Sequence, residues 1–358
     1  MSKGKRLAGG ILLLALIALT FYLLLRNQPV SQLLDVLGRV KPGYVVLGLG
    51  LMFVFVSCEA MCSKLILGRL GHSLTYRRCL SFSFVGFYVS SITPSATGGQ
   101  PAQIYYMSKS GVPAAHGALN MMMIAVCYQV TTLLYAAAAA IAMPGILSAM
   151  GAGMGLLLLY GGLVMLALTA GMLCFMFLPN AARRLMNGLL NLGVRLRVVR
   201  NRAAAEERLE RQMAEYRSGA ACFRQNAGLA PALLGLNAVQ LTALFLVPFV
   251  VYKAFGLSGH GVLELVGAQA LLTLATSSLP LPGAVGATEG GFVTLFTLFF
   301  GASLVTPAVL VSRGISFYAF LLLSGLVTLG VHFAAKRWSG EKNTCAAAAG
   351  LSEAAPAA

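Results

Sequence analysis

The sequence predicts an all-α polytopic membrane protein, built as an inverted-repeat helical bundle with two re-entrant helical hairpins broken by glycine and proline. Three observations carry this prediction. The 358 residues are 58% hydrophobic and only 10% charged, whereas a soluble domain carries about 25% charged residues. Several apolar runs reach the about 20 residues that one membrane crossing needs. Two further apolar segments are interrupted at matching places in the two halves, a pattern typical of transporters.

Six full spans are expected from the apolar runs, at residues 7–25, 44–67, 119–142, 156–178, 229–255 and 305–333. The first is predicted to be a retained helix, because residues 26–29 offer no signal-peptide cleavage site. The spans and hairpins form one transmembrane domain over residues 1–342, with halves at about 7–142 and 156–334. The alanine-rich tail, residues 343–358, is expected to be disordered.

The two interrupted segments cover residues 80–108 and 262–301. The second contains the run Ser277 to Gly291, which holds two prolines, four glycines and Glu289. Broken backbone survives in lipid only where protein or a water-filled cavity surrounds it. Three residues of the first break recur 188 positions later in the second, and the pairs are Ser90 with Ser278, Pro94 with Pro282 and Gly98 with Gly286. The matching spacing predicts an internal repeat of the transporter type.

The distribution of basic residues predicts the orientation, since cytoplasmic loops carry an excess of Lys and Arg. With the N-terminus in the cytoplasm, 21 basic residues lie inside, in the segments 1–6, 64–78, 181–224 and 336–342 and at Lys109. Four lie outside, namely Arg26, Arg39, Lys41 and Lys253. Both termini are therefore expected in the cytoplasm of a multi-pass cell-membrane protein. The first hairpin then enters from the cytoplasm, and the second enters from outside, between loops at 256–261 and 301–306.

One sizeable polar segment, residues 181–224, carries ten Arg and four Glu. Leu185, Leu189 and Leu192 begin an apolar helical stripe beside the arginines. Such a helix can lie in the headgroup layer, or it can form a solvated cytoplasmic helix pair that docks a soluble partner. The net charge of +16 is expected to meet anionic phospholipid headgroups and no nucleic acid, because most of it flanks apolar spans. A homo-oligomer is compatible with these features.

Enzyme motifs are scarce, so the sequence predicts no catalytic site, no metal and no cofactor. Asp35 is the single aspartate of the chain, which excludes a DxD sugar-nucleotide site. No HExxH, CxxC, GxSxG or P-loop pattern occurs. The seven cysteines fall mostly in apolar runs and are interpreted as small hydrophobic residues. The four histidines fall at predicted span edges.

Three ionisable residues, Glu59, Glu289 and Arg313, fall within the predicted membrane region. Each costs about 2.5–3.5 kcal/mol on insertion scales and is a functional candidate by default. Glu289 and Arg313 can form a structural pair that ties the second hairpin to the last helix. Alternatively, Arg313 meets a phosphate, or Glu289 meets a cation or proton. Glu59 can serve the site or reach backbone N–H groups of the first hairpin.

Uncharged polar side chains gather at the first break. They either cradle a phosphate diester, helped by exposed N–H groups where half-helices begin, or only satisfy their own broken backbone. The candidate substrate-binding residues of both breaks and their surroundings are Ser90, Pro94, Thr97, Gly98, Gly99, Gln100, Gln103, Pro282, Gly283, Gly286, Glu289, Gly290, Arg313 and Glu59.

Residues 93–107, 280–292 and 312–325 resemble the signature regions of the lysylphosphatidylglycerol synthase transmembrane, or flippase-like, family. The most specific part is the spacing of Pro282, Gly283, Gly286 and Glu289. The family includes the N-terminal flippase part of the multiple peptide resistance factor proteins, which links it to antibiotic resistance. The resemblance implies movement of phospholipid between leaflets, with aminoacylated phosphatidylglycerol one candidate. The alternatives are a lipid-modifying transferase, although the soluble aminoacyl-transfer domain is absent from this chain, and a non-transporting scaffold.

Overall fold

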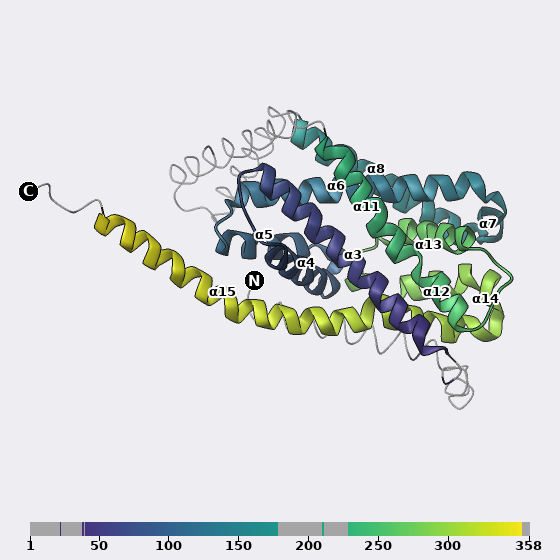
Figure 1. The fold of residues 1–358 in the computed structure, drawn as a ribbon. Helices are drawn as coiled ribbons and strands as arrows, with labels where there is room; N and C mark the ends of the chain where they lie inside the picture. The colour runs from purple at the N-terminus through teal and green to yellow at the C-terminus, as the bar shows by residue number, and fades with distance from the viewer. Residues whose placement is uncertain (1–21, 23–37, 39, 178–209, 211–227, 353–358) are drawn as a thin grey trace, which may run out of the picture.

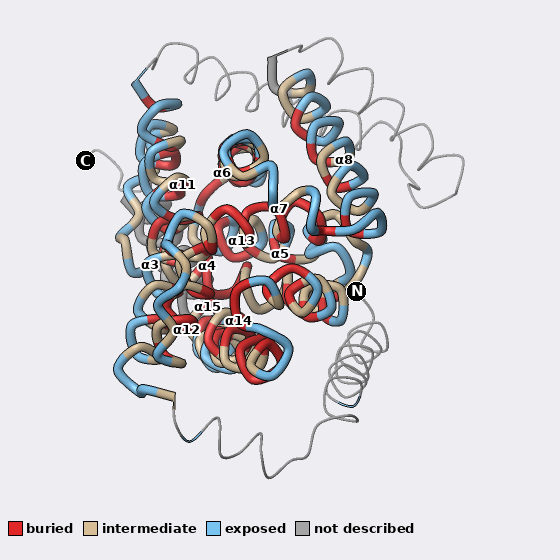
Figure 2. The backbone as a smooth tube through the Cα atoms, turned by 90° about the vertical axis from the view of Figure 1, so that its right-hand side faces the viewer, coloured by how far each residue is buried: buried red, intermediate tan, exposed pale blue. Residues whose placement is uncertain are grey.

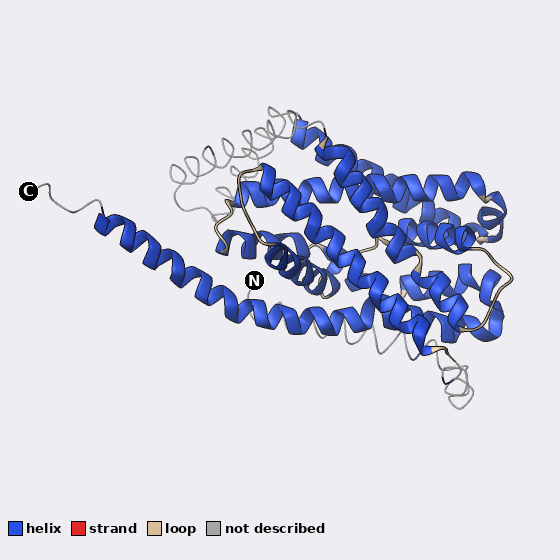
Figure 3. Ribbon diagram, viewed as in Figure 1, coloured by secondary structure: helices blue, strands red, loops and turns tan. Residues whose placement is uncertain are grey.

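The computed structural model describes residues 22, 38, 40–177, 210 and 228–352, with the side chains of 176–177 and 336–352 left aside. Within these residues the regular structure is helical, and turns and short loops join the helices (Figure 3). The chain is therefore an all-α polytopic membrane protein, as predicted. The expected span at 7–25 and the basic segment at 181–224 lie outside the described residues.

The helices follow the predicted order of spans and broken segments (Figure 1). The first half consists of α3 (Pro42–Arg69), α4 (Tyr76–Ser91), the short turn η1 (Pro94–Ala96), α5 (Gly99–Lys109) and α6 (Ala114–Ala142). It leads through α7 (Pro144–Ala149) into α8 (Gly151–Phe177). The second half consists of α8 and then of α11 (Leu229–Phe245), α12 (Val247–Ala254), α13 (Val262–Thr276), η2 (Pro282–Ala284), α14 (Ala287–Arg313), η3 (Gly314–Tyr318) and α15 (Ala319–Ser352).

Five helical stretches of the described residues are long and apolar enough to cross a membrane. Four are single crossings, formed by α3, by α6, by α8 and by α11 together with α12. The fifth runs from Pro282 to Ala335, and its 54 residues exceed the about 20 residues of one crossing. This stretch contains the second arm of the interrupted segment and the last predicted span.

The two breaks share a backbone conformation at the predicted spacing of 188 residues. Each break is a short turn that begins at proline, Pro94 in one and Pro282 in the other. The central residues, Ser95 and Gly283, both have positive φ, 50° and 57° respectively. The residues after them, Ala96 and Ala284, have φ of 54° and 51°. The same offset separates the starts of α5 and α14, so the repeat predicted from three residues extends to local structure.

The packing of the two halves is reciprocal. α4 packs against α15 of the second half, and its counterpart α13 packs against α6 of the first half. α4 also packs against α5, and α13 against α14, while η1 contacts η2. In Figure 1, α4 and α5 lie toward the left of the bundle and α13 and α14 toward the right. The two helix–break–helix units therefore meet at their breaks.

Buried residues lie along the inward faces of the helices (Figure 2). One large apolar cluster surrounds α13 and α14, and it includes Phe292 and Phe296. A second surrounds α4, α5 and α11, and it includes Phe82 and Met107. The outer faces of α8 and α15 expose large apolar side chains, among them Leu156, Leu163, Leu322 and Leu326. Exposed apolar faces of this kind match the hydrocarbon of a bilayer.

Two details differ from the expectations. The loop expected at residues 301–306 is a single kink at Gly301, whose φ of 73° and ψ of 164° interrupt α14. Glycine adopts such angles at little cost, so one residue is enough to redirect the helix. The helix α15 continues to Ser352, where the sequence predicted a disordered tail from residue 343. Alanine has the highest helix propensity, and this accounts for the continuation.

Candidate functional site

The second break ends where Gly286 begins α14. Gly286 has a φ of 87°, a conformation that favours glycine. Its backbone N–H donates a 2.7 Å hydrogen bond to Oε2 of Glu289. This is half of a capping box, in which a carboxylate three residues into the helix satisfies an orphan N–H at its start. The Pro-Gly-x-x-Gly-x-x-Glu spacing of the sequence therefore builds a capped helix start within the break.

The other carboxylate oxygen of Glu289 accepts a hydrogen bond from Arg313. Nε of Arg313 lies 2.7 Å from Oε1 of Glu289, and the two residues are 9% and 2% exposed. A second guanidinium nitrogen donates to the carbonyl oxygen of Gly283 at 3.2 Å. The predicted pairing of Glu289 with Arg313 is thus present. It joins the break to the end of α14 and leaves neither charge buried without a partner.

A π turn completes the surroundings of this pair. Residues 314–318 form η3 directly after Arg313. Hydrogen bonds in a π turn join residues five apart, so Tyr318 is brought back toward Arg313. The hydroxyl of Tyr318 donates to Oε1 of Glu289 at 3.4 Å. The Arg313 guanidinium lies 4.4 Å from the centre of the Phe317 ring, a favourable cation–π distance.

The hydroxyls of the first break bond to its own backbone. Thr93 donates to the carbonyl of Val89 at 2.7 Å and accepts from the Gly98 N–H at 3.0 Å. Thr97 donates to the Pro94 carbonyl at 2.9 Å. Ser90 donates to the Ala96 carbonyl at 3.4 Å. These bonds match the second of the two predicted roles, in which the polar groups satisfy the broken backbone.

The tip of the first break is nevertheless accessible. Residues 94–97 and Gln100 are exposed. The second break is more enclosed, since Pro282 and Val285 are buried. Gly290 is exposed on α14. The accessible face of the paired breaks is therefore the one that carries the hydroxyl-rich turn.

Glu59 on α3 ties a long helix to the first hairpin through a side chain. Its Oε1 accepts a 2.9 Å hydrogen bond from Nε2 of Gln103 on α5. The sequence offered backbone N–H groups as partners, and the structure provides the Gln103 amide instead. Oε1 of Gln103 is buried and has no hydrogen-bond partner. Gln103 is thus the one predicted amide that combines burial with an unused acceptor.

Close helix approach explains the small residues of the first hairpin. A Cβ added at Gly99 would collide with the Ser90 hydroxyl and lie 2.7 Å from the Gly86 carbonyl oxygen. A Cβ at Gly86 would collide with the Gln103 amide. Small residues let membrane helices pack backbone to backbone. Gly99 is therefore required by packing of α4 against α5.

The predicted charged residues take part in two separate hydrogen-bonded groups. One contains Gly283, Gly286, Glu289 and Arg313 around the second break, and the other joins Glu59 to Gln103 beside the first. The sequence did not single out Phe317 or Tyr318 for a role. Phe317 follows Arg313 by four residues, a helical spacing that could have indicated it, whereas Tyr318 faces Glu289 only because of the π turn. Among the described residues, no three His, Cys, Asp or Glu side chains could hold a metal ion.

Residues 8–324 match the family described as the lysylphosphatidylglycerol synthase TM region. The chain belongs to this family. The match includes both breaks, Glu289 and Arg313, and it extends into α15. No curated protein matches the chain. Membership relates the chain to membrane proteins of lipid modification or transport.

Proposed function

We propose that this family member moves phospholipid between the leaflets of the cell membrane and is not itself an enzyme. The observation that carries the proposal is the contact between η1 and η2. Two breaks that meet inside a helical bundle provide polar backbone groups away from lipid tails, which is the usual position of a transporter site. The exposed hydroxyl-bearing turn at residues 94–97 gives a headgroup a polar surface to pass.

Helix lengths favour two re-entrant hairpins. α4 has 16 residues and α13 has 15, so each spans only about 22–24 Å at about 1.5 Å per residue. The hydrocarbon core is about 30 Å thick, and neither arm crosses it alone. With α5 beside α4 and α14 beside α13, each pair returns to its own side. The basic-residue distribution puts the first pair on the cytoplasmic side and the second outside.

An inverted repeat of this form gives alternating access. Each hairpin packs on a helix of the opposite half, α4 on α15 and α13 on α6. Rocking of one half against the other would expose the breaks first to one leaflet and then to the other. The Glu289–Arg313 tie would hold the second break rigid during that motion. Anionic phospholipid, such as phosphatidylglycerol, is the substrate class that the basic cytoplasmic face favours. Aminoacylated phosphatidylglycerol, whose amino groups offset the phosphate charge, is a candidate because of the family match alone.

A liposome assay tests this function. The purified chain is reconstituted into vesicles with traces of fluorescent phosphatidylglycerol, lysylphosphatidylglycerol or phosphatidylcholine, and an impermeant reductant is added outside. We expect the reductant to quench more fluorescent lipid than the outer leaflet holds. The additional quenching should be faster for the phosphatidylglycerol lipids than for phosphatidylcholine. Protein-free vesicles and vesicles with an unrelated polytopic protein are the controls. Quenching that stops at the outer-leaflet pool for every lipid would overturn the proposal.

A further inference from the structure

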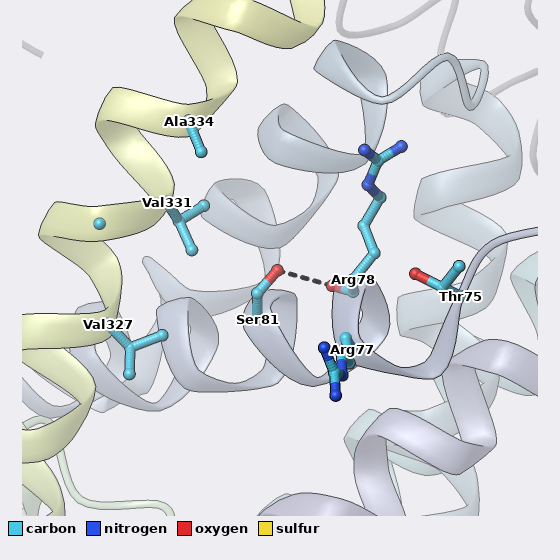
Figure 4. A pocket seen from close by; sticks show the side chains of 8 residues that line it. Thr75, Arg77, Arg78, Ser81, Val327, Val331 and Ala334 are labelled. Atoms are coloured by element: carbon cyan, nitrogen blue, oxygen red, sulfur yellow. Dashed lines mark hydrogen bonds between the residues drawn. The ribbon is translucent and has the colours of Figure 1, made fainter.

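A groove of about 460 Å³ opens between the start of α4 and the middle of α15 (Figure 4). This volume is in the range of small-molecule sites, about 300–1,000 Å³. One wall carries polar groups and the other is apolar. The lining residues are Thr75, Arg77, Arg78 and Ser81 on one side and Val327, Gly330, Val331 and Ala334 on the other. The groove is distinct from the Glu289–Arg313 site.

The polar wall is cationic. Arg77 is exposed and Arg78 is half-buried, and none of the described residues that line the groove is acidic. The first turn of α4 contains no acidic residue, and the hydroxyl of Thr75 does not cap the helix. The helix start therefore adds its own partial positive charge to that of the two arginines. Guanidinium forks and helix N-termini both suit phosphate oxygens.

The opposite wall suits a hydrocarbon chain. Val327 and Val331 lie one turn apart on α15 and face α4 in Figure 4. The neighbouring surface of α15 exposes Leu326, Leu329 and Phe333, so the apolar wall continues onto the lipid-facing side of the helix. A Cβ added at Gly330 would have no atom within 4 Å. The groove is open at that point.

We propose that the groove binds an anionic phospholipid of the cytoplasmic leaflet. Its phosphodiester would lie against Arg77, Arg78 and the start of α4, and one acyl chain would follow Val327 and Val331. A free phosphate would use only the cationic wall, whereas an amphiphile uses both. The idea that a lipid is loaded in this groove before it crosses the membrane rests on the proposed function. The idea that the groove binds the lipid does not, and it is tested without measuring translocation.

Trp338 provides the probe. It is the only tryptophan of the chain and lies four residues beyond Ala334 on α15. The full chain is placed in phosphatidylcholine nanodiscs with increasing fractions of brominated phosphatidylglycerol, and Trp338 fluorescence is recorded. We expect Trp338 fluorescence to be quenched at a lower fraction of brominated phosphatidylglycerol than of brominated phosphatidylcholine. Arg77→Gln should raise the fraction of brominated phosphatidylglycerol needed for quenching about fivefold, which is the effect of removing one basic residue near the surface.

Two variants make the test specific. Lys109→Gln removes a basic residue of the same face outside the groove, and it should change the quenching far less than Arg77→Gln. Gly330→Leu keeps every charge and fills the open space of the groove. It should therefore abolish the preference for phosphatidylglycerol. Thermal unfolding confirms that this variant is folded. Inorganic phosphate and glycerol phosphate are added as competitors, and we expect neither to remove the preference.

Each contrary result overturns a stated part of the proposal. Equal quenching by the two brominated lipids would exclude a selective site. Equal effects of Arg77→Gln and Lys109→Gln would reduce the interaction to general surface charge. An unchanged preference in Gly330→Leu would exclude the groove as its location. Loss of the preference in inorganic phosphate would assign the site to free phosphate. None of these results would alter the translocation measured in vesicles.

Discussion

Arg313 bonds Glu289 at 2.7 Å and the carbonyl of Gly283 at 3.2 Å, so one side chain holds both the helix start and the preceding turn of the second break. Breaking a buried pair by removing one partner costs roughly 3–5 kcal/mol, because the other charge is left uncompensated. Glu289→Gln and Arg313→Gln should each lose stability of this order. The double variant should lose less than either, and thermal unfolding in detergent measures this. A double variant less stable than both single variants would contradict the pairing.

The same double variant separates a structural tie from a role in transport. We expect it to recover stability and to remain defective in lipid translocation, because the break would lose the charged groups that fix its shape. The measurement is the vesicle assay at matched protein content, with wild type beside it. Recovery of both stability and translocation would make the pair a structural clasp and direct attention to Gln100 and Gln103.

Matched backbone positions give a second prediction. Gly283 has a φ of 57°, and a Cβ there would collide with the Phe317 ring. Gly283→Ala should therefore cost roughly 1–2 kcal/mol from backbone strain alone, and more from the collision. Ser95 has the same conformation with φ of 50° on the exposed tip, so Ser95→Gly should be neutral or stabilising.

Gly290→Ala is the control for these substitutions. Gly290 is helical and exposed, with no atom within 4 Å of an added Cβ, so alanine there should stabilise α14 by about 1 kcal/mol. Thermal unfolding of the three variants checks the order. Equal losses in Gly283→Ala and Gly290→Ala would show that the turn does not need glycine.

A third prediction concerns acid sensitivity at the loop between α3 and α4. His72 lies 2.8 Å from His116, and burial, followed by the charge of His116, lowers the pKa of His72 from its ordinary 6.5. The folded state therefore prefers neutral His72, while the unfolded state takes up a proton at the ordinary pKa. This contribution to stability is fully present above about pH 6.5 and is lost as the pH falls toward the lowered pKa.

Thermal unfolding at about pH 7.5 and about pH 5.5 brackets the ordinary histidine pKa and measures this effect. Wild type should lose more stability on acidification than His72→Gln. The control is His260→Gln. His260 lies in the loop before α13, and its ring is hydrogen-bonded to Glu264 at 3.1 Å. This variant should keep the loss of stability on acidification that His72 causes. An unchanged acid sensitivity in His72→Gln would contradict the assignment.

Much of this fold could be predicted, because the length of an apolar run and the distribution of basic residues are properties of whole segments and not of single side chains. The spans in the described residues, both breaks and the 188-residue repeat follow from such patterns. The Glu289–Arg313 pair was also predictable, since two opposite charges in one apolar half have few other partners. The sequence could not distinguish a loop at residues 301–306 from a kink at Gly301, because a glycine is compatible with either structure.

Side-chain details at the site depended on three-dimensional placement. Tyr318 faces Glu289 through a π turn, which no helical periodicity indicates. Gln103 reaches Glu59 because Gly86 lets α5 approach α4, a packing effect with no local signal. The groove beside Arg77 combines α4 with α15, which are about 250 residues apart in the chain. The sequence alone identified its arginines only as a basic loop.

The proposed lipid translocation depends most on the proposed opposed approach of the two hairpins to the centre of the membrane. Single cysteines at Lys109, Ser258 and Ser303, all exposed, report it in a chain whose native cysteines are replaced. The measurement is labelling by an impermeant maleimide in right-side-out and inside-out vesicles. Position 109 should react only from the cytoplasmic side, and positions 258 and 303 only from outside. Labelling of 109 and 258 from the same side would contradict opposed hairpins.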